Sequence, residues 1–342
     1  MQDRIYYLDL LRALAIMLVF TGHTVLSYGS PVMLAPLQFG GTGVDLFFLL
    51  SGWLIGSQLF AEQQKFLNID VKRFWIRRWM RTMPAYFAVL LMTLSQLYLT
   101  KDSVSNPAPY FFFVQNYFNP LDYFSISWSL SVEEQFYLVI APFILIIQRF
   151  TPRTQTLVLV LILILPTVFR QLGWFGSVNE THVRWDCCIM GVLLAHIYYK
   201  HRQHWDACKK YAGTMLIVGT VIYLAFFYFR WSPPFDGYTD PSKLVLACVF
   251  ALLVFYAVNT PVINKPMGYT IIMHISTRSY SLYLLHPEAL ALAKRFFAET
   301  HFVIYYGIAL AVSLLITEVL YRLVEVPFIT MRSKYSFSSK RD

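Results

Sequence analysis

The feature that most constrains this chain is a series of apolar stretches, each about as long as a lipid bilayer is thick. A helix needs about 20 mostly apolar residues to cross the hydrocarbon core, and by that measure the sequence predicts ten spans. These are 6–27, 40–60, 83–99, 128–148, 156–170, 185–199, 211–229, 243–262, 276–295 and 302–324. The aromatic stretch 107–118 is too short to cross and is predicted to be re-entrant or interfacial. We therefore expect an all-α, polytopic membrane protein.

The composition supports this fold class. Hydrophobic residues make up 57% of the 342 residues and charged residues only 14%, against about 25% charged in ordinary soluble domains. This balance excludes a disordered chain, a collagen and a secreted disulfide scaffold. The net charge of +9 could suggest nucleic acid, but the basic residues lie in short loops between the apolar stretches. We therefore expect membrane lipid as a partner and no nucleic acid.

The basic loops also predict an orientation. Nineteen Lys and Arg residues fall in segments on the side of the N-terminus and seven on the other side, with Arg12 and Arg278 inside spans. Because cytoplasmic loops carry the excess of Lys and Arg, both ends are predicted to be cytoplasmic. Ten spans satisfy that parity, as eight or twelve would. The first span carries two charges and lacks a small-residue cleavage site, so we expect it to stay rather than be removed as a signal.

The four cysteines predict neither a disulfide framework nor a metal site. Cys187 and Cys188 are adjacent, whereas Cys208 and Cys248 are isolated, and no spacing typical of metal ligands is present. We expect four buried free thiols and no bound metal.

Ionisable residues inside spans are costly and usually line a cavity or a pathway. In the first span Arg12 and His23 are 11 residues apart, so on a helix they share nearly one face, about 16 Å apart along the axis. Asp9 lies one turn before Arg12. These three residues therefore predict a polar stripe through the membrane. The alternative is an Asp–Arg pair that helps assembly, together with an interior histidine whose hydrogen bonds are satisfied.

The second span supplies a candidate partner for that stripe. Asp45 lies near the outer end of the span, at about the depth of His23 if the first two helices form a hairpin. The sequence therefore predicts Asp45 as a residue that orients the imidazole. The glycines of this span permit close helix contact, and packing is the expected role of most of them.

The inner segment VKRFWIRRWMRTMP is the densest basic stretch. Arg78 and Arg81 are three residues apart, so on a helix both guanidinium groups point the same way, and Arg suits bidentate capture of phosphate. The alternative is positive-inside topology with anionic lipid. Alternation with Phe74, Trp75 and Trp79 predicts a helix lying in the interface with its aromatic side chains toward lipid.

Further charges lie in later spans. Glu133 and Glu134 come one turn into the fourth span, and Tyr137 follows at helical spacing. Since adjacent side chains point about 100° apart, only one of the two carboxylates is expected to face the interior. His286 falls inside the ninth span. Glu318 and Arg322, four residues apart in the last span, predict a structural ion pair.

These segments resemble the acyltransferase-3 family of integral-membrane acyltransferases, which includes bacterial O-antigen and other cell-envelope O-acetyltransferases. The motifs that carry the resemblance are LDLLRALAIMLVFTGH, GVDLFFLLSGWLI, RRWMRTMPAY, SWSLSVEEQFY, SYSLYLLHP and RLVEVP, in this order. The resemblance covers about residues 4–330. It implies a single acyltransferase-3 transmembrane domain over 1–330, followed by a short basic cytoplasmic tail over 331–342, and the chain looks like the stand-alone form of the family.

The resemblance implies an enzyme that transfers acyl groups other than aminoacyl groups. The donor would be acyl-CoA, normally acetyl-CoA, bound as a substrate from the cytoplasm, with no permanently bound cofactor. The acceptor would be a hydroxyl of a carbohydrate or glycolipid, such as O-antigen, capsule or another envelope glycan, and the location the bacterial inner membrane. By position in the motifs, Arg12 and His23 match the essential pair, and Arg78 and Arg81 contribute from the inner loop.

Acyl transfer from a thioester to a hydroxyl needs a base, a group that stabilises developing charge, and a site for the CoA phosphates. An imidazole can accept a proton at physiological pH, so our hypothesis makes His23 the general base, oriented by Asp45 or Glu134. Arg12 would stabilise charge in the pathway, and Arg78 and Arg81 would bind the CoA phosphates. The remaining predicted pathway residues are Asp9, Tyr137 and His286.

Alternatives remain open at this point. An acyl-histidine intermediate fits the same residues, and the sequence leaves open the acceptor, the acyl chain length, the side of the membrane on which transfer occurs and the oligomeric state. Buried charges along a helix are equally what a secondary transporter or a flippase of an envelope precursor needs. A transporter would be expected to show two matching halves with broken spans, and no such halves are visible.

Overall fold

The protein is helical throughout the part of the chain that the structure describes. The computed structural model describes residues 5–101, 104–118, 121, 123–231, 242–262, 264–297 and 299–332, and these ranges contain no strand. The long helices are α1 (Tyr6–Ser27), α2 (Thr42–Phe66), α3 (Val71–Thr100), α5 (Ser127–Ile147), α6 (Pro152–Gln171), α7 (Asp186–Lys200), α9 (Ala212–Trp231), α10 (Ser242–Asn259), α11 (Tyr269–Phe297) and α12 (Phe302–Leu320). Shorter elements are the 3₁₀ helices η1 (Val32–Gly41), η2 (Gln115–Tyr117), η3 (Thr181–Val183) and η4 (Lys209–Tyr211), the helices α4 (Ala108–Phe111), α8 (Arg202–Cys208) and α13 (Val326–Arg332), and the π-helix η5 (Tyr321–Glu325).

Eight helical stretches within these ranges are long and apolar enough to cross a membrane, so the chain is a multi-pass membrane protein. Each of the ten predicted spans falls on a helix. However, α7 has only 15 residues, and α11 carries more charged and polar residues than an apolar span. The count of ten therefore stays a prediction, as does the cytoplasmic placement of both ends.

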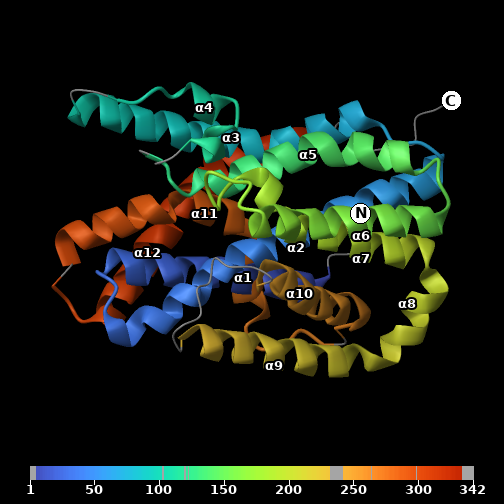
Figure 1. Cartoon of the computed structure of the whole chain (residues 1–342). Helices are drawn as coiled ribbons and strands as arrows, with labels where there is room; N and C mark the ends of the chain where they lie inside the picture. The colour runs from blue at the N-terminus through green and yellow to red at the C-terminus, as the bar shows by residue number, and fades with distance from the viewer. Residues whose placement is uncertain are drawn as a thin grey trace.

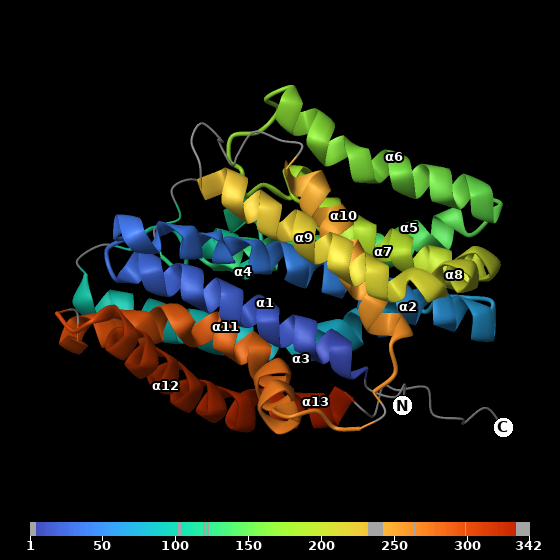
Figure 2. The same cartoon turned by 90° about the horizontal axis from the view of Figure 1, so that it is seen from below.

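The long helices lie side by side with their axes in roughly the same direction (Figures 1 and 2). The first helix, α1, lies in the interior of the bundle and packs against α11, α2, α10 and η1. The stripe predicted on α1 therefore faces other helices rather than lipid. Asp9, at its start, is only 3% exposed.

Close backbone contact holds α2 against its neighbours, as predicted for the glycines of this span. A Cβ atom on Gly52 would lie 2.0 Å from the carbonyl oxygen of Cys188 in α7, and one on Gly43 would lie 2.3 Å from the carbonyl oxygen of Ala15 in α1. No real Cβ contact is that short, so only glycine allows these helices to approach so closely. Gly41, by contrast, has nothing within 4 Å.

The basic segment is the start of a long helix, and the prediction that its aromatic side chains face lipid is wrong. It forms the first turns of α3, which continues without a break to Thr100 and whose N-terminus is capped by Asp70, since that carboxylate accepts a hydrogen bond from the backbone of Arg73. Phe74 is 3% exposed and lies in the core. The indole of Trp75 donates a hydrogen bond to the carbonyl of Tyr137 in α5. This face packs on protein because α3 crosses the bundle beside α5 and α11.

Three smaller predictions can also be compared with the structure. The stretch 107–118 forms only α4 and η2, too short to cross, as predicted. Cys187 and Cys188 are buried free thiols, but Cys208, at the end of α8, is half-buried and Cys248, on a surface face of α10, is exposed, so the prediction of uniform burial was wrong. The predicted tail begins inside α13, and its residues 333–342 lie outside the described residues.

The last span carries the predicted ion pair. Arg322 donates a hydrogen bond to Glu318 over one helical turn, and Arg278 of α11 binds the same carboxylate. The π-helix η5 then turns Glu325 into the interior, where it is 4% exposed and accepts a hydrogen bond from Ser281 of α11. These contacts hold α12 and η5 against α11.

Candidate active site

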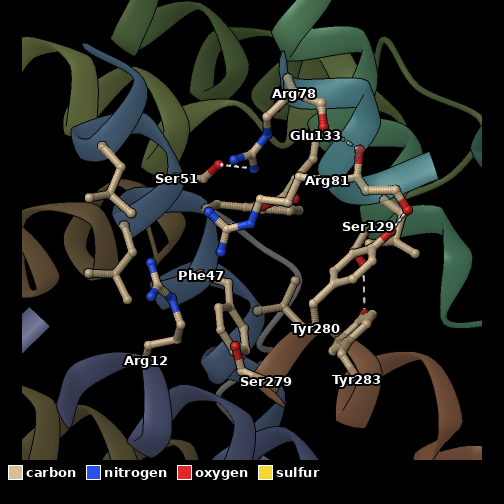
Figure 3. Close-up of a pocket in the computed structure, with 16 residues that line it drawn as sticks. Arg12, Phe47, Ser51, Arg78, Arg81, Ser129, Glu133, Ser279, Tyr280 and Tyr283 are labelled. Carbon is tan, nitrogen blue, oxygen red and sulfur yellow. Dashed lines mark hydrogen bonds between the residues drawn. The ribbon is translucent and has the colours of Figure 1, made fainter. Parts of the chain in front are cut away.

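An electropositive cavity of about 90 Å³ lies between α1, α2, α3, α5 and α11. Three guanidinium groups, those of Arg12, Arg78 and Arg81, line it together with a single carboxylate, Glu133. Figure 3 shows the three guanidinium groups directed toward the same space. The positive charge and planar N–H donors of the guanidinium groups make this cavity suited to an anion, above all a phosphate.

Arg78 is fixed in place by two neighbouring helices. Its guanidinium donates to the hydroxyl of Tyr137 and lies 3.4 Å from Oγ of Ser51, and its Cζ atom is 4.0 Å from the centre of the Tyr137 ring. The Tyr137 hydroxyl in turn donates to Glu133 at 2.8 Å and is 2.7 Å from Oγ of Ser51. The network therefore positions the Arg78 side chain from both α2 and α5.

Arg81 is one turn further along α3 and lines the same cavity. Within the described part of the chain, none of the hydrogen bonds involves its guanidinium. A guanidinium has five N–H donors in a fixed fork. Arg81 is therefore the cavity group with the most unused donor capacity.

Arg12 enters the cavity from α1, where the predicted pair with Asp9 is present. The Arg12 Nη1 atom is 3.3 Å from Oδ1 of Asp9, and the hydroxyl of Ser276 donates to the same oxygen at 2.6 Å. Asp9 therefore links α1 to α11 while it holds Arg12 in position. The stripe is both a structural contact and one wall of the cavity.

His23, at the other end of the stripe, pairs with a second histidine. Its Nδ1 atom is 2.7 Å from Nε2 of His286, and the ring centres are 4.9 Å apart. His286 is fully buried, and its Nδ1 atom is 2.7 Å from the carbonyl oxygen of Tyr283. Tyr283 also lines the cavity. The histidine pair therefore begins one turn of α11 beyond the cavity wall.

Two aromatic side chains stand at the cavity end nearest the histidines. Phe47 and Tyr283 both line the cavity, with ring centres 6.4 Å apart. The Tyr283 hydroxyl is held by Ser129, whose Oγ atom is 2.6 Å away. The ring centre of Tyr283 is also 5.6 Å from that of His286, so Tyr283 contacts both the cavity and the histidine pair.

Comparison with known proteins places the chain in a family. The model of a family described as an acyltransferase domain matches residues 5–322. The chain belongs to the acyltransferase-3 family. The resemblance drawn from the motifs is thereby confirmed.

The curated relatives of this acyltransferase-3 chain are O-acetyltransferases. It is 25% identical over 94% of its length to the peptidoglycan O-acetyltransferase OatA of Listeria monocytogenes. It is 26% identical, again over 94% of its length, to the O-acetyltransferase OatA of Staphylococcus aureus. The chain spans 55% and 56% of those two proteins. No solved structure is significantly similar to it.

In this acyltransferase-3 chain neither predicted partner contacts His23, which corrects the hypothesis of a carboxylate that orients it. Asp45 pairs instead with Arg184 at 3.1 Å and Lys243 at 2.9 Å. Glu134 accepts a hydrogen bond from Thr82 at 2.7 Å. Matching depth in a hairpin says nothing about rotation around the helix axis, and that rotation turns Asp45 toward Arg184, which precedes α7, and Lys243, in the first turn of α10.

Both adjacent carboxylates on α5 face protein, which corrects the expectation that only one would. Glu133 lines the cavity, and Glu134 is 5% exposed on the α3 side. Because α5 is surrounded on more than one side, a 100° difference in direction does not bring either one to lipid. Asp186 forms a buried ion pair with Arg170 at 2.7 Å.

Several residues of the site were not predicted. The cations Arg184 and Lys243 counted only as loop charges in the topology, and Ser51, Tyr280 and Tyr283 were not singled out. Tyr283 could have been found, since it stands three residues before His286 in the motif SYSLYLLHP. Within the described residues no group of three or more His, Cys, Asp or Glu side chains is placed to hold a metal ion.

Proposed function

We propose that this protein is a membrane O-acetyltransferase that moves an acetyl group from acetyl-CoA to a hydroxyl of a cell-envelope glycan. The proposal is supported by the electropositive cavity whose wall on α11 leads, one turn further, to the paired imidazoles. The printed names of the curated relatives support the reaction type. The bacterial cytoplasmic membrane is the proposed location.

The cavity is the proposed site for the donor phosphates. Arg78 is held rigidly by protein groups, whereas Arg81 has unused donors, so the pair offers both a fixed and a free guanidinium. The excess of Lys and Arg predicts that the end of the bundle that carries these arginines faces the cytoplasm, where acyl-CoA is present.

Separation along α1 supports a role for Arg12 in binding the donor rather than at the reacting carbonyl. Arg12 and His23 are 11 residues apart, about 16 Å on a helix, and Arg12 lines the cavity. A guanidinium at that distance cannot touch an oxyanion formed beside His23. The extended pantetheine arm of CoA would carry the acetyl group from the cavity, past Phe47 and Tyr283, to the imidazole.

The reaction then needs one proton acceptor. As the acceptor oxygen forms a bond to the thioester carbon, its proton moves to the free nitrogen of His23. Collapse of the tetrahedral intermediate breaks the carbon–sulfur bond, and the imidazolium returns the proton to sulfur. The products are the acetyl ester and CoA thiol, and the imidazole is neutral again.

The acceptor that the relatives favour is peptidoglycan, because the Listeria protein carries that name. O-antigen and capsule sugars offer the same hydroxyl chemistry. Mass spectrometry of envelope glycans from a deletion strain distinguishes them, since the modified polymer loses an acetyl group from its sugar.

Replacement of His23 by alanine tests the proposed function. We expect the rate of acetyl transfer from acetyl-CoA by purified protein to fall by about 10²- to 10⁴-fold, the usual contribution of a general base. His204→Ala, at an exposed position of α8, is the matched control. Substantial turnover by His23→Ala at equal expression would remove His23 from catalysis. A transporter or flippase would show neither hydrolysis nor transfer in the parent protein.

A further inference from the structure

Two consecutive hydrogen bonds link a backbone carbonyl to His286 and His286 to His23. Because the carbonyl can only accept, this hydrogen-bond chain determines which ring nitrogens carry a hydrogen. The carbonyl oxygen of Tyr283 is 2.7 Å from Nδ1 of His286. Nε2 of His286 is 2.7 Å from Nδ1 of His23. Within the described residues no hydrogen bond involves Nε2 of His23.

A proline explains why the carbonyl is available. In an α-helix the carbonyl of Tyr283 would accept a hydrogen bond from the backbone N–H four residues later. That residue is Pro287, which lies inside α11 and has no N–H. The pyrrolidine ring also displaces the carbonyl of the residue four positions before it. The Tyr283 carbonyl is therefore left for a side-chain donor, and the His286 ring fills that place.

A carbonyl oxygen only accepts hydrogen bonds, so Nδ1 of His286 must carry a hydrogen. In a neutral imidazole the other nitrogen is then an acceptor, and Nε2 of His286 accepts from His23. The hydrogen of that bond therefore belongs to Nδ1 of His23. The lone pair of a neutral His23 is left on Nε2, which has no hydrogen-bond partner among the described residues.

Burial favours the neutral form of His286 on which this assignment depends. Its side chain is fully buried, and neither ring forms an ion pair with a carboxylate of the described residues. An unpaired cation in such surroundings is strongly unfavourable. The aromatic rings that contact His286 are those of Tyr283 in α11 and His23 in α1, and neither is an anion at physiological pH.

The geometry points to a tautomer relay, in which the Tyr283 carbonyl sets the protonation of His286 and His286 sets that of His23. The relay leaves Nε2 of His23 as the atom that takes the proton from the acceptor hydroxyl. His286 is therefore a positioning residue for the acetyl transfer, and Pro287 is the residue that makes its carbonyl partner available. This inference rests on the proposed function, because it specifies which atom of His23 acts.

Two amide substitutions at position 286 separate positioning from simple packing. A glutamine places its carbonyl oxygen near the position of Nε2, so His286→Gln still offers His23 an acceptor. An asparagine occupies the position of Nδ1 only, so His286→Asn keeps the Tyr283 contact and loses the one to His23. We expect kcat within about 10-fold of the parent for glutamine and a loss of about 10²- to 10⁴-fold for asparagine, with the KM for acetyl-CoA unchanged in both. Equal losses in the two variants, or none in either, would overturn the relay.

The parent protein provides a test that needs no variant to be active. With ¹⁵N-labelled histidine, the chemical shifts of the ring nitrogens distinguish protonated from unprotonated atoms, and His23→Ala identifies the His23 signals among the eight histidines. We expect a protonated Nδ1 and an unprotonated Nε2. A His23 protonated on Nε2 would overturn the relay even if it proved essential. Conversely, high activity in His23→Ala with the expected tautomer would refute the proposed catalytic role and leave the hydrogen-bond chain intact.

Discussion

Arg81 offers the sharpest test of the donor site, because its side chain lines the cavity and makes no hydrogen bond within the described residues. Arg81→Gln therefore removes a donor to the ligand without leaving an internal acceptor unpaired, unlike a change at Arg78. A hydrogen bond to a charged group contributes about 1.5–3 kcal/mol, and about 1.4 kcal/mol corresponds to tenfold in affinity. We expect the KM for acetyl-CoA to rise about 10- to 150-fold with a smaller change in kcat.

Comparison of two donors makes this test specific. Initial rates are measured with purified protein and either acetyl-CoA or acetyl-pantetheine, which has the same thioester and no phosphates. The penalty of Arg81→Gln should be present with the first donor and absent with the second. Lys72→Gln removes the same charge at an exposed position of α3 and should leave both rates unchanged. An equal loss with both donors would refute the phosphate role of Arg81.

Two further substitutions test the packing that builds the site. Gly52→Ala places a methyl carbon 2.0 Å from the Cys188 carbonyl oxygen, so it should lower the free energy of unfolding by about 1–3 kcal/mol. The thermal transition in detergent should therefore lie below that of the control Gly41→Ala. Equal transition temperatures for the two variants would mean that α2 and α7 separate without penalty. Asp45→Asn leaves two buried cations without their carboxylate and should destabilise the protein by about 3–5 kcal/mol. The control Asp206→Asn, in an exposed ion pair, should leave the thermal transition unchanged. An Asp45→Asn variant as stable as the parent would show that the ion-pair cluster contributes no net stability.

Local physical rules were enough to predict the helices. Residues 6–27 were predicted as a span, and α1 has those bounds, because apolar length and backbone hydrogen bonding are properties of a single segment. Sequence spacing was also enough to predict the relative direction of the Arg78 and Arg81 side chains. Three residues apart on any helix, they point the same way, and both line the cavity.

Contacts between segments were harder to predict. A membrane span can rotate about its axis without any change in its length or hydropathy. Asp45 and His23 could therefore be placed at one depth by sequence, yet Asp45 faces Arg184 and Lys243. The aromatic side chains at the start of α3 were misassigned to lipid for the same reason, because whether a face meets lipid or α5 depends on the neighbours.

The sequence by itself determined an all-α membrane protein, the segments that become its long helices, and an acid, a guanidinium and an imidazole along α1. Only the tertiary structure decided that His286 is the partner of His23, with 262 residues between them in the chain, and that three arginines meet in one cavity. The physical reason is that helix formation depends on neighbours in sequence, whereas a hydrogen bond between helices requires their relative rotation and position, which the packing of the whole bundle sets.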